Sequence, residues 1–246
     1  MTVYLVGAGP GDPGLLTRAG AELLARCDVV VHDRLANAAL LELAPPSARR
    51  IDVGKLPRHA CPSQDEINDL LVTLGREGLE VVRLKGGDPM VFGRGGEEAA
   101  SLRAAGVPHR VVPGVTSAIA APAAAGIPVT LRGVSAAFTV VSGHEAPEGS
   151  GGVAWEALGR LGGTIVVLMA TATIGRIAER LASGGLAPDT PVAAVTDGTL
   201  PEQVVWRGTL AEVADAGVRP PATFVIGAVA AVAVVGPAGG TDEDSA

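Results

Sequence analysis

Aromatic residues and positive charge are both scarce in this sequence. Phenylalanine, tryptophan and tyrosine make up 2% of the 246 residues, so stacking platforms for nucleic-acid bases are not expected. The formal net charge is -7 at pH 7, whereas non-specific nucleic-acid binding requires a basic face. The sequence therefore predicts no nucleic-acid partner.

Cysteine is also rare. The chain has two cysteines, Cys27 and Cys61, and they lack the CxxC spacing that is typical of zinc sites and redox dithiols. Both are expected to be buried thiols in a reducing compartment. No metal site is predicted.

Long hydrophobic runs are missing as well. The most apolar run, residues 222–235, is interrupted by Gly227 and is shorter than the roughly 20 residues of a membrane-spanning helix. We expect it to form buried sheet, with no membrane partner. The first residues, MTVYLVGAGPGD, lack a basic region followed by an apolar stretch, so we expect a cytoplasmic protein that opens on a strand. Residues 241–246 are small and acidic and are expected to form a disordered tail.

Short β-rich runs alternate with segments of helical periodicity. Hydrophobic residues make up 48% of the chain, enough for a well-filled core. Strands are expected near residues 3–6, 28–31, 50–53, 80–84 and 109–112, and such alternation is typical of parallel sheet. The second half repeats the pattern, with its last strand expected over residues 223–235. We predict an α/β fold of two lobes with mainly parallel sheets: domains 1–113 and 114–240, with a ligand cleft between them.

The segment at residues 82–98, VRLKGGDPMVFGRGGEE, is the most informative part of the chain. It begins as a strand, breaks into a glycine-rich loop and returns to a helical pattern at Glu97. Glycines at the carboxyl end of a strand allow the backbone to approach a ligand closely. In open α/β sheets, ligands bind at that edge. Charges of both signs among the glycines favour a binding site over a plain connector.

The glycines near the N-terminus allow a different interpretation. Gly7-x-Gly9-x-Gly11 follows the first strand, as in dinucleotide-binding folds, and Asp33 is the only candidate for the ribose-binding acid. However, the spacing is not GxGxxG, and Pro10 lies inside it. A nucleotide-dependent oxidoreductase is therefore the alternative from a different functional class.

Three segments resemble one family. LKGGDPMVFGRGGEE resembles the central signature of the uroporphyrinogen-III C-methyltransferases, within the tetrapyrrole methylases. VGAGPGDPGLLT is similar to the family's opening segment, and residues 111–133 resemble its next block. Two departures are Met90, where Phe is commoner, and Leu131, where the family has His. The likeness extends from residue 6 to about residue 227.

The resemblance implies a class III methyltransferase fold and a homodimer. It also implies transfer of two methyl groups from S-adenosylmethionine to uroporphyrinogen III, giving precorrin-2 for siroheme or cobalamin synthesis. A later precorrin C-methyltransferase is the nearer alternative. Because the tetrapyrrole substrate is rich in carboxylates, we expect a locally basic site. Loop residues that could form it include Arg34, Arg58 and His59. For each of them, the alternative interpretation is a solvated charge on the protein surface.

Site residues follow from the matched positions. Asp33 and Lys55 each come directly after a predicted strand and match the family's acid/base positions; a structural ion pair is the alternative. The residues that match cofactor contacts are Pro10, Gly86, Gly87, Asp88, Val91, Thr116, Ser117, Met169, Gly198 and Ala222. Those that match substrate contacts are Arg94, Glu97, Arg132 and Met169.

Overall fold

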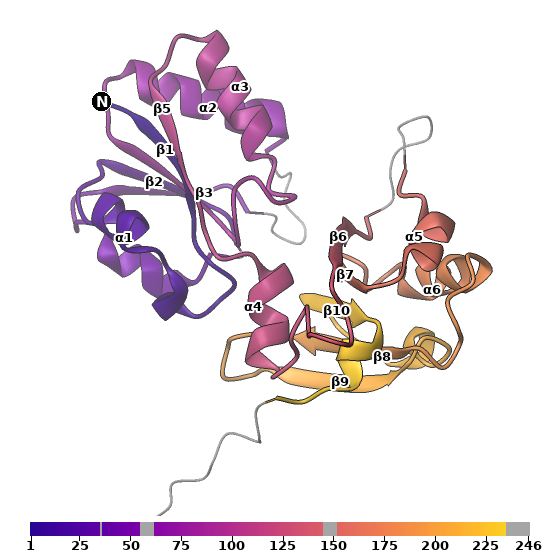
Figure 1. The fold of residues 1–246 in the computed structure, drawn as a ribbon. Coiled ribbons are helices and arrows are strands. Elements are labelled where there is room, and N and C mark those ends of the chain that lie inside the picture. Colours follow the sequence, from indigo (N-terminus) through magenta and orange to yellow (C-terminus); the bar gives the residue numbers. More distant parts are fainter. Residues whose placement is uncertain (35, 55–61, 145–151, 235–246) are drawn as a thin grey trace, which may run out of the picture. The chain divides into compact units, whose positions relative to one another are not determined.

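The computed structural model describes residues 1–34, 36–54, 62–144 and 152–234. The chain divides into two compact units, Met1–Thr116 and Ser117–Ala246. Each unit holds one five-stranded sheet with helices on it (Figure 1). Among the helices in the described ranges, none combines the length and apolar character needed to cross a bilayer.

The first unit contains a fully parallel sheet, as predicted from the alternating pattern. Its strands are β1 (Val3–Gly7), β2 (Val29–His32), β3 (Arg49–Asp52), β4 (Val81–Lys85) and β5 (His109–Val112), in the order β3-β2-β4-β1-β5. All four strand pairings are parallel. The carboxyl ends of the strands therefore share one edge of the sheet.

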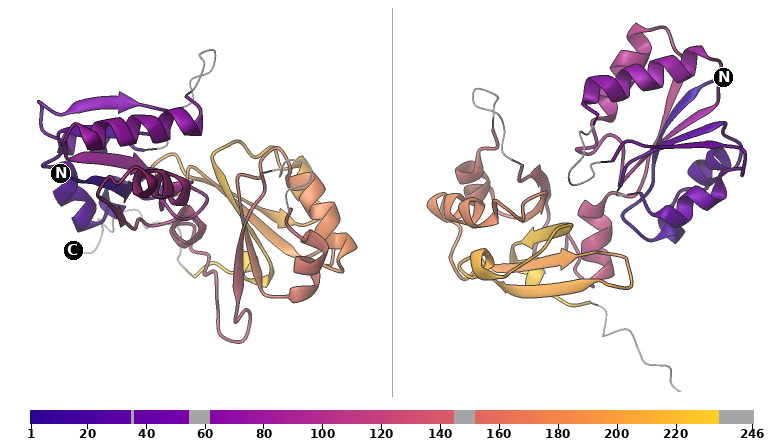
Figure 2. Two further views of the ribbon diagram at one scale, coloured as in Figure 1. Left: turned by 90° about the horizontal axis from the view of Figure 1, so that it is seen from above. Right: turned by 180° about the vertical axis from the view of Figure 1, so that it is seen from behind.

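Helices cover both faces of this sheet. On one face, α1 (Arg18–Leu24) and the 3-10 helix η2 (Ala38–Leu43) bury Leu23, Leu24 and Leu40. On the other face, α2 (Gln64–Arg76) and α3 (Gly95–Ala104) bury Leu71, Leu74 and Leu102. The rear view in Figure 2 shows the sheet between these two helical layers.

Local capping explains where two helices begin. A capping box begins α2, where Ser63 Oγ accepts from Glu66 N at 3.2 Å and Ser63 N donates to Glu66 Oε2 at 2.6 Å. The residues after Asp12 do not form one continuous helix. A 3-10 turn, η1 (Pro13–Leu15), is followed by extended backbone, and Thr17 caps a new helix by accepting from Gly20 N at 3.1 Å.

The sheet of the second unit is mixed. Its strands are β6 (Phe138–Ser142), β7 (Thr164–Leu168), β8 (Pro191–Thr196), β9 (Val204–Thr209) and β10 (Ala222–Ile226), in the order β6-β7-β10-β8-β9. Only β6 and β7 pair in parallel, and the other three pairings are antiparallel. The expectation of a mainly parallel second sheet is therefore wrong, because β8 and β9 form a hairpin and β10 inserts between β7 and β8.

Helices cover this second sheet on both faces too. Trp155, Ile177 and Leu181 of α5 (Trp155–Leu161) and α6 (Ile174–Ser183) pack on one face, together with Val213 of η3 (Val213–Asp215). Ala121 of α4 (Ser117–Ala124) and Val229 of η4 (Ala228–Ala231) pack in a separate cluster that contains Val225. The predicted strand over residues 223–235 is wrong beyond Ile226. Gly227 has φ 131° and breaks the strand before η4.

Candidate active site

Three loops meet at the carboxyl edge of the first sheet, and glycines make their contact possible. Ala8 N donates to Lys85 O at 2.7 Å, and Gly87 N donates to Gly9 O at 2.7 Å. A Cβ on Gly114 would lie 2.2 Å from Gly87 O and 2.7 Å from Gly7 Cα. No side chain fits in that space, so the loops after β1, β4 and β5 pack backbone to backbone.

Asp88 fixes two of these loops. Its Oδ2 accepts from Gly114 N at 2.9 Å, and its Oδ1 accepts from Met90 N at 2.7 Å. Val91 N in turn donates to Asp88 O at 3.2 Å. Both oxygens of the Asp88 side chain thus bind backbone groups, and the carboxylate shapes the glycine loop from within.

The space beside Gly87 is open. Gly87 has φ +66°, and a Cβ built there would meet, among the residues that the structure describes, only Thr116 Cα, at 3.9 Å. The half-buried backbone of Gly86 and Gly87 is therefore not covered by a neighbouring side chain of the described residues at this point, as close approach of a ligand to backbone requires. Of the predicted cofactor contacts, the structure gathers six at this edge of the first unit: Pro10, Gly86, Gly87, Asp88, Val91 and Thr116.

The remaining predicted cofactor contacts lie in the second unit. Met169 follows β7, and Ala222 opens β10 opposite Thr196, the last residue of β8. Thr223 pairs with Leu168, so Met169, Gly198 and Ala222 come together at one edge of that sheet. Ser117 begins α4.

Strained backbone marks the same edge of the second sheet. Met169 has φ 57° and is 50% exposed, an unusual combination for a large apolar residue. Asp197 and Thr199 also have positive φ, at 48° and 75°. Between them, Gly198 packs so closely on α4 that a Cβ would lie 2.5 Å from Ala121 Cβ. Such outliers persist where the surrounding structure enforces them, commonly at functional sites.

Two of the predicted substrate contacts are paired with each other. Arg94 donates from Nε to Glu97 Oε1 at 2.9 Å and from Nη2 to Glu97 Oε2 at 2.6 Å. These hydrogen bonds raise the pKa of Arg94 and lower the pKa of Glu97. Both side chains are about half exposed. The guanidinium is thus already arranged to hold a carboxylate at an accessible position.

Arg132, a third predicted substrate contact besides Met169, is exposed in a tight turn. Leu131 N donates to Ser135 O at 3.0 Å and Ser135 N donates to Leu131 O at 2.8 Å, which closes the turn around Arg132.

The two predicted acid/base residues have different outcomes. Asp33 follows β2 at the carboxyl edge of the first sheet, and its side chain is 30% exposed. Lys55 lies outside the described residues, as do Arg58 and His59. Gly54, at the end of the described segment, packs on the backbone of the exposed Arg34, with a built Cβ 2.5 Å from Arg34 N.

The structure contains a buried charge cluster that was not predicted from the sequence. We define it as Asp33, Arg83, Lys85 and Glu98. Arg83 donates from Nη2 to Asp33 Oδ1 at 2.6 Å and from Nε to Glu98 Oε1 at 3.2 Å. Lys85 Nζ donates to Glu98 Oε1 at 2.7 Å. Burial, and next the charge of Arg83, lower the pKa of Lys85. Arg83 and Lys85 lie within an otherwise apolar strand, and this pattern could have predicted the cluster because buried charges need partners.

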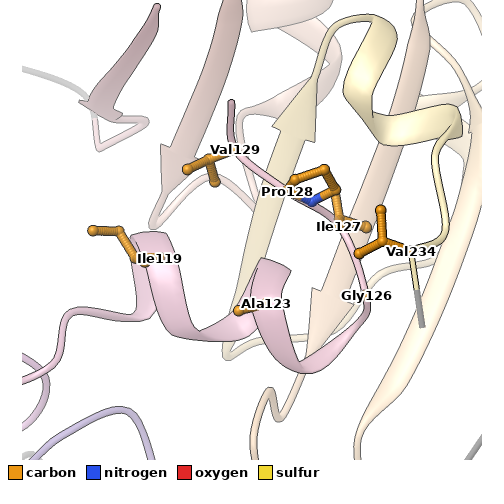
Figure 3. A pocket seen from close by; sticks show the side chains of 7 residues that line it. All are labelled: Ile119, Ala123, Gly126, Ile127, Pro128, Val129 and Val234. Carbon is orange, nitrogen blue, oxygen red and sulfur yellow. The ribbon is translucent and has the colours of Figure 1, made fainter. Parts of the chain in front are cut away.

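An apolar hollow in the second unit does not suit an anionic substrate. It has a volume of about 200 Å³. Figure 3 shows the side chains around it, from α4 and the segment after it, with Val234 opposite. The lining offers no charged group for a carboxylate. Its residues are Ile119, Ala123, Gly126, Ile127, Pro128, Val129 and Val234. Nor do the described residues group three or more His, Cys, Asp or Glu side chains in a way that could hold a metal ion.

Comparison with known proteins gives one consistent result. The family model of the tetrapyrrole (corrin/porphyrin) methylases matches residues 2–214. The S-adenosyl-L-methionine-dependent uroporphyrinogen III methyltransferase of Methanosarcina barkeri is 50% identical over 232 residues, which cover 92% of this chain and 91% of that protein. Siroheme synthase of Neisseria meningitidis is 47% identical over 93% of this chain, but the match spans only 47% of that longer protein.

Solved structures agree. Uroporphyrin-III C-methyl transferase from Thermus thermophilus, in complex with S-adenosylhomocysteine, superposes with a TM-score of 0.81 at 44% identity, over 93% of this chain and 98% of that one. The family model covers far more than half of the chain, and the Methanosarcina barkeri relative is 50% identical over 92% of this chain and 91% of its own length. The chain therefore belongs to the tetrapyrrole methylases.

Proposed function

We propose that this protein is an S-adenosylmethionine-dependent C-methyltransferase that methylates uroporphyrinogen III twice to give precorrin-2. The observation that carries the proposal is the 50% identity, over nine-tenths of both chains, to a relative named for this activity. The loop geometry of the first unit supports it, because the open space beside the Gly87 Cα suits a ligand held through peptide groups.

The residues present fit the cofactor. S-adenosylmethionine supplies, when bound, a methyl group on a positively charged sulfur. In the first unit, Gly86 and Gly87 would line its site with backbone, and Asp88 would hold the loop in shape through its bonds to Gly114 N and Met90 N. In the second unit, Met169, Gly198 and Ala222 would contribute from the strained sheet edge.

The substrate would be held by charge. Arg94 is the strongest candidate, because its guanidinium already binds a carboxylate in the bidentate manner that a substrate carboxylate would use. Glu97 would have to release Arg94 at that moment. Arg132, exposed in its turn, would supply a second positive charge.

Asp33 would remove the proton. Attack of the electron-rich pyrrole carbon on the methyl group leaves a cationic adduct, which becomes neutral by losing a proton from the methylene bridge beside the methylated ring. Asp33 is partly exposed at the sheet edge, with one oxygen bound by Arg83 and the other not engaged by it. A positioned base of this kind is typically worth about 10² to 10⁴ in rate. Lys55 is proposed as the acid, or as the charge that keeps Asp33 ionised.

We also propose that the protein acts as a cytoplasmic homodimer. The resemblance to the family supports the dimer, and the unpaired, buried Cys27 suits a reducing compartment. Sedimentation equilibrium tests the dimer directly: a single species of monomer mass at micromolar concentration would refute it.

Label transfer separates the proposed function from its alternatives. The protein is incubated with methyl-labelled S-adenosylmethionine and either uroporphyrinogen III or a later precorrin. We expect label on uroporphyrinogen III. Label only on the later precorrin would identify a different methylase of the same fold. No transfer to either, with tight binding of a nicotinamide nucleotide, would favour the oxidoreductase.

A further inference from the structure

Arg83 occupies an unusual place for a charged residue. It lies in β4, between β2 and β1 in the sheet, and all five residues of β4 are buried. Its own side chain is 2% exposed. Removing a guanidinium from water is costly unless charged partners and hydrogen bonds compensate. The partners of Arg83 therefore indicate what the residue does.

One edge of the guanidinium is fixed inside the unit. Arg83 Nε donates to Glu98 Oε1 at 3.2 Å, and the Glu98 side chain is fully buried at the start of α3. The same oxygen accepts from Lys85 Nζ at 2.7 Å. Long contacts from Arg83 Nη1 to the carbonyls of Val31 and Leu84, at 3.5 and 3.4 Å, complete this side. The planar group therefore has little freedom to turn.

The other edge points to Asp33. Arg83 Nη2 donates to Asp33 Oδ1 at 2.6 Å, the shortest contact in the buried charge cluster. Asp33 Oδ2 is not engaged by Arg83. The side chains of Arg83, Lys85 and Glu98 are at most 4% exposed, whereas that of Asp33 is 30% exposed. Within the cluster, the Glu98 side chain is therefore inaccessible to solvent, whereas the Asp33 side chain is accessible.

We propose that Arg83 is a positioning residue for the proton-removal step, acting through Asp33, and that Glu98 and Lys85 hold Arg83 in place. The proposal rests on the proposed function and deepens it. In that step a C–H bond of the methylene bridge beside the methylated ring breaks, because the methylated carbon itself carries no hydrogen. The electron pair of that bond neutralises the cationic ring, and the proton passes to Asp33 Oδ2. By binding Oδ1, Arg83 sets the direction in which Oδ2 faces. Neither cofactor nor substrate needs to touch Arg83.

A purely structural role would have a different signature. If the cluster only neutralised buried charge, loss of Arg83 would destabilise the unit, and any effect on turnover would not depend on whether residue 33 can accept a proton. If Arg83 positions Asp33, the effect on turnover requires the Asp33 carboxylate. A double-mutant cycle distinguishes the two roles.

The cycle uses Arg83→Lys, Asp33→Asn and the double variant, with Arg49→Lys as the matched control. Lysine keeps the charge but cannot bind Glu98 and Asp33 with one rigid fork. Arg49 lies on β3 of the same sheet and reaches Glu77 only at 3.9 Å, with both side chains at least half exposed.

We expect Arg83→Lys to lower kcat about 10²-fold, as for a misplaced catalytic group. The KM for uroporphyrinogen III and the affinity for S-adenosylhomocysteine should stay unchanged. In the Asp33→Asn background, Arg83→Lys should lower kcat no further. Arg49→Lys should behave as wild type.

Two results would overturn the proposal. One is an equal fall in kcat in both backgrounds, and the other is an unchanged kcat in Arg83→Lys. If Arg83→Lys does not fold, Glu98→Gln takes its place, because it removes the charged group that fixes Arg83; the same dependence on Asp33 is expected, and its absence counts against the proposal. Absence of wild-type turnover would instead refute the proposed function, so the two failures are distinguishable.

Discussion

Gly114→Ala offers a sharp test of the glycine-loop geometry. The added Cβ would lie 2.2 Å from Gly87 O, 2.7 Å from Gly7 Cα and 2.9 Å from Gly7 C. All three are backbone atoms at strand ends, so no flexible side chain can move aside. The loops would have to separate by about 1 Å, and overpacking of this kind typically costs about 1 to 3 kcal/mol.

The displacement would be felt at the proposed cofactor site. Gly114 N also donates to Asp88 Oδ2 at 2.9 Å, so the shift would disturb the aspartate that shapes the Gly87 loop. We expect the affinity for S-adenosylhomocysteine to fall at least about tenfold, which corresponds to 1.4 kcal/mol. Titration calorimetry measures the affinity, and urea unfolding measures the stability.

Gly96→Ala is the matched control. A Cβ at Gly96 meets no atom of the described part of the chain within 4 Å, and the residue lies in the first turn of α3. Alanine there should leave the affinity for S-adenosylhomocysteine unchanged and stabilise the helix by at most about 1 kcal/mol. Wild-type affinity in folded Gly114→Ala would refute the assignment of these loops to the cofactor.

Three further predictions concern charged and titratable groups. Arg94→Ala should raise the KM for uroporphyrinogen III by about one to two decades, since a hydrogen bond to a charged group is worth about 1.5 to 3 kcal/mol. Arg180→Ala breaks a similar exposed pair with Glu156 and should leave this KM unchanged. Steady-state kinetics of the two variants measures the difference. Hydrogen bonds from Arg180 lower the pKa of Glu156 from 4.5 to about 2, so the pair's contribution to stability is complete above pH 4.5 and is lost as the pH falls toward 2; the stability difference between wild type and Glu156→Gln should follow this course, and a difference independent of pH would contradict it. Burial raises the pKa of Cys27 to about 11, so alkylation of this thiol at pH 8 should be slow in the folded protein and fast after unfolding, as followed by peptide mass analysis; fast labelling of the folded protein would contradict the buried position.

The first unit was more predictable from sequence than the second. Its helices each connect two parallel strands, so local alternation of strand and helix determines the sheet. In the second unit, β10 inserts between β7 and β8, and this pairing joins residues far apart in the chain. Nothing in the local pattern of residues 222–226 distinguishes a parallel from an antiparallel partner. The end of that strand, in contrast, was signalled by Gly227.

The candidate site was also predictable from the sequence only in part. The glycine loop could be predicted because glycine at a strand end has a local meaning. The contacts of Arg83 with Asp33 and Glu98 join residues 50 and 15 positions apart, so their identity depends on the folded sheet. Their existence could have been inferred, since an arginine in an apolar strand needs a carboxylate. The positive φ of Met169 leaves no mark in the sequence.

Mass analysis of the product is the sharpest test of whether this chain adds two methyl groups to one tetrapyrrole. The protein is incubated anaerobically with uroporphyrinogen III and an excess of S-adenosylmethionine, and the product is sampled until its mass stops changing. We expect a final mass higher by two methyl groups, with one S-adenosylhomocysteine released for each. A substrate whose mass never changes, or a product that stops at one methyl group, would contradict it.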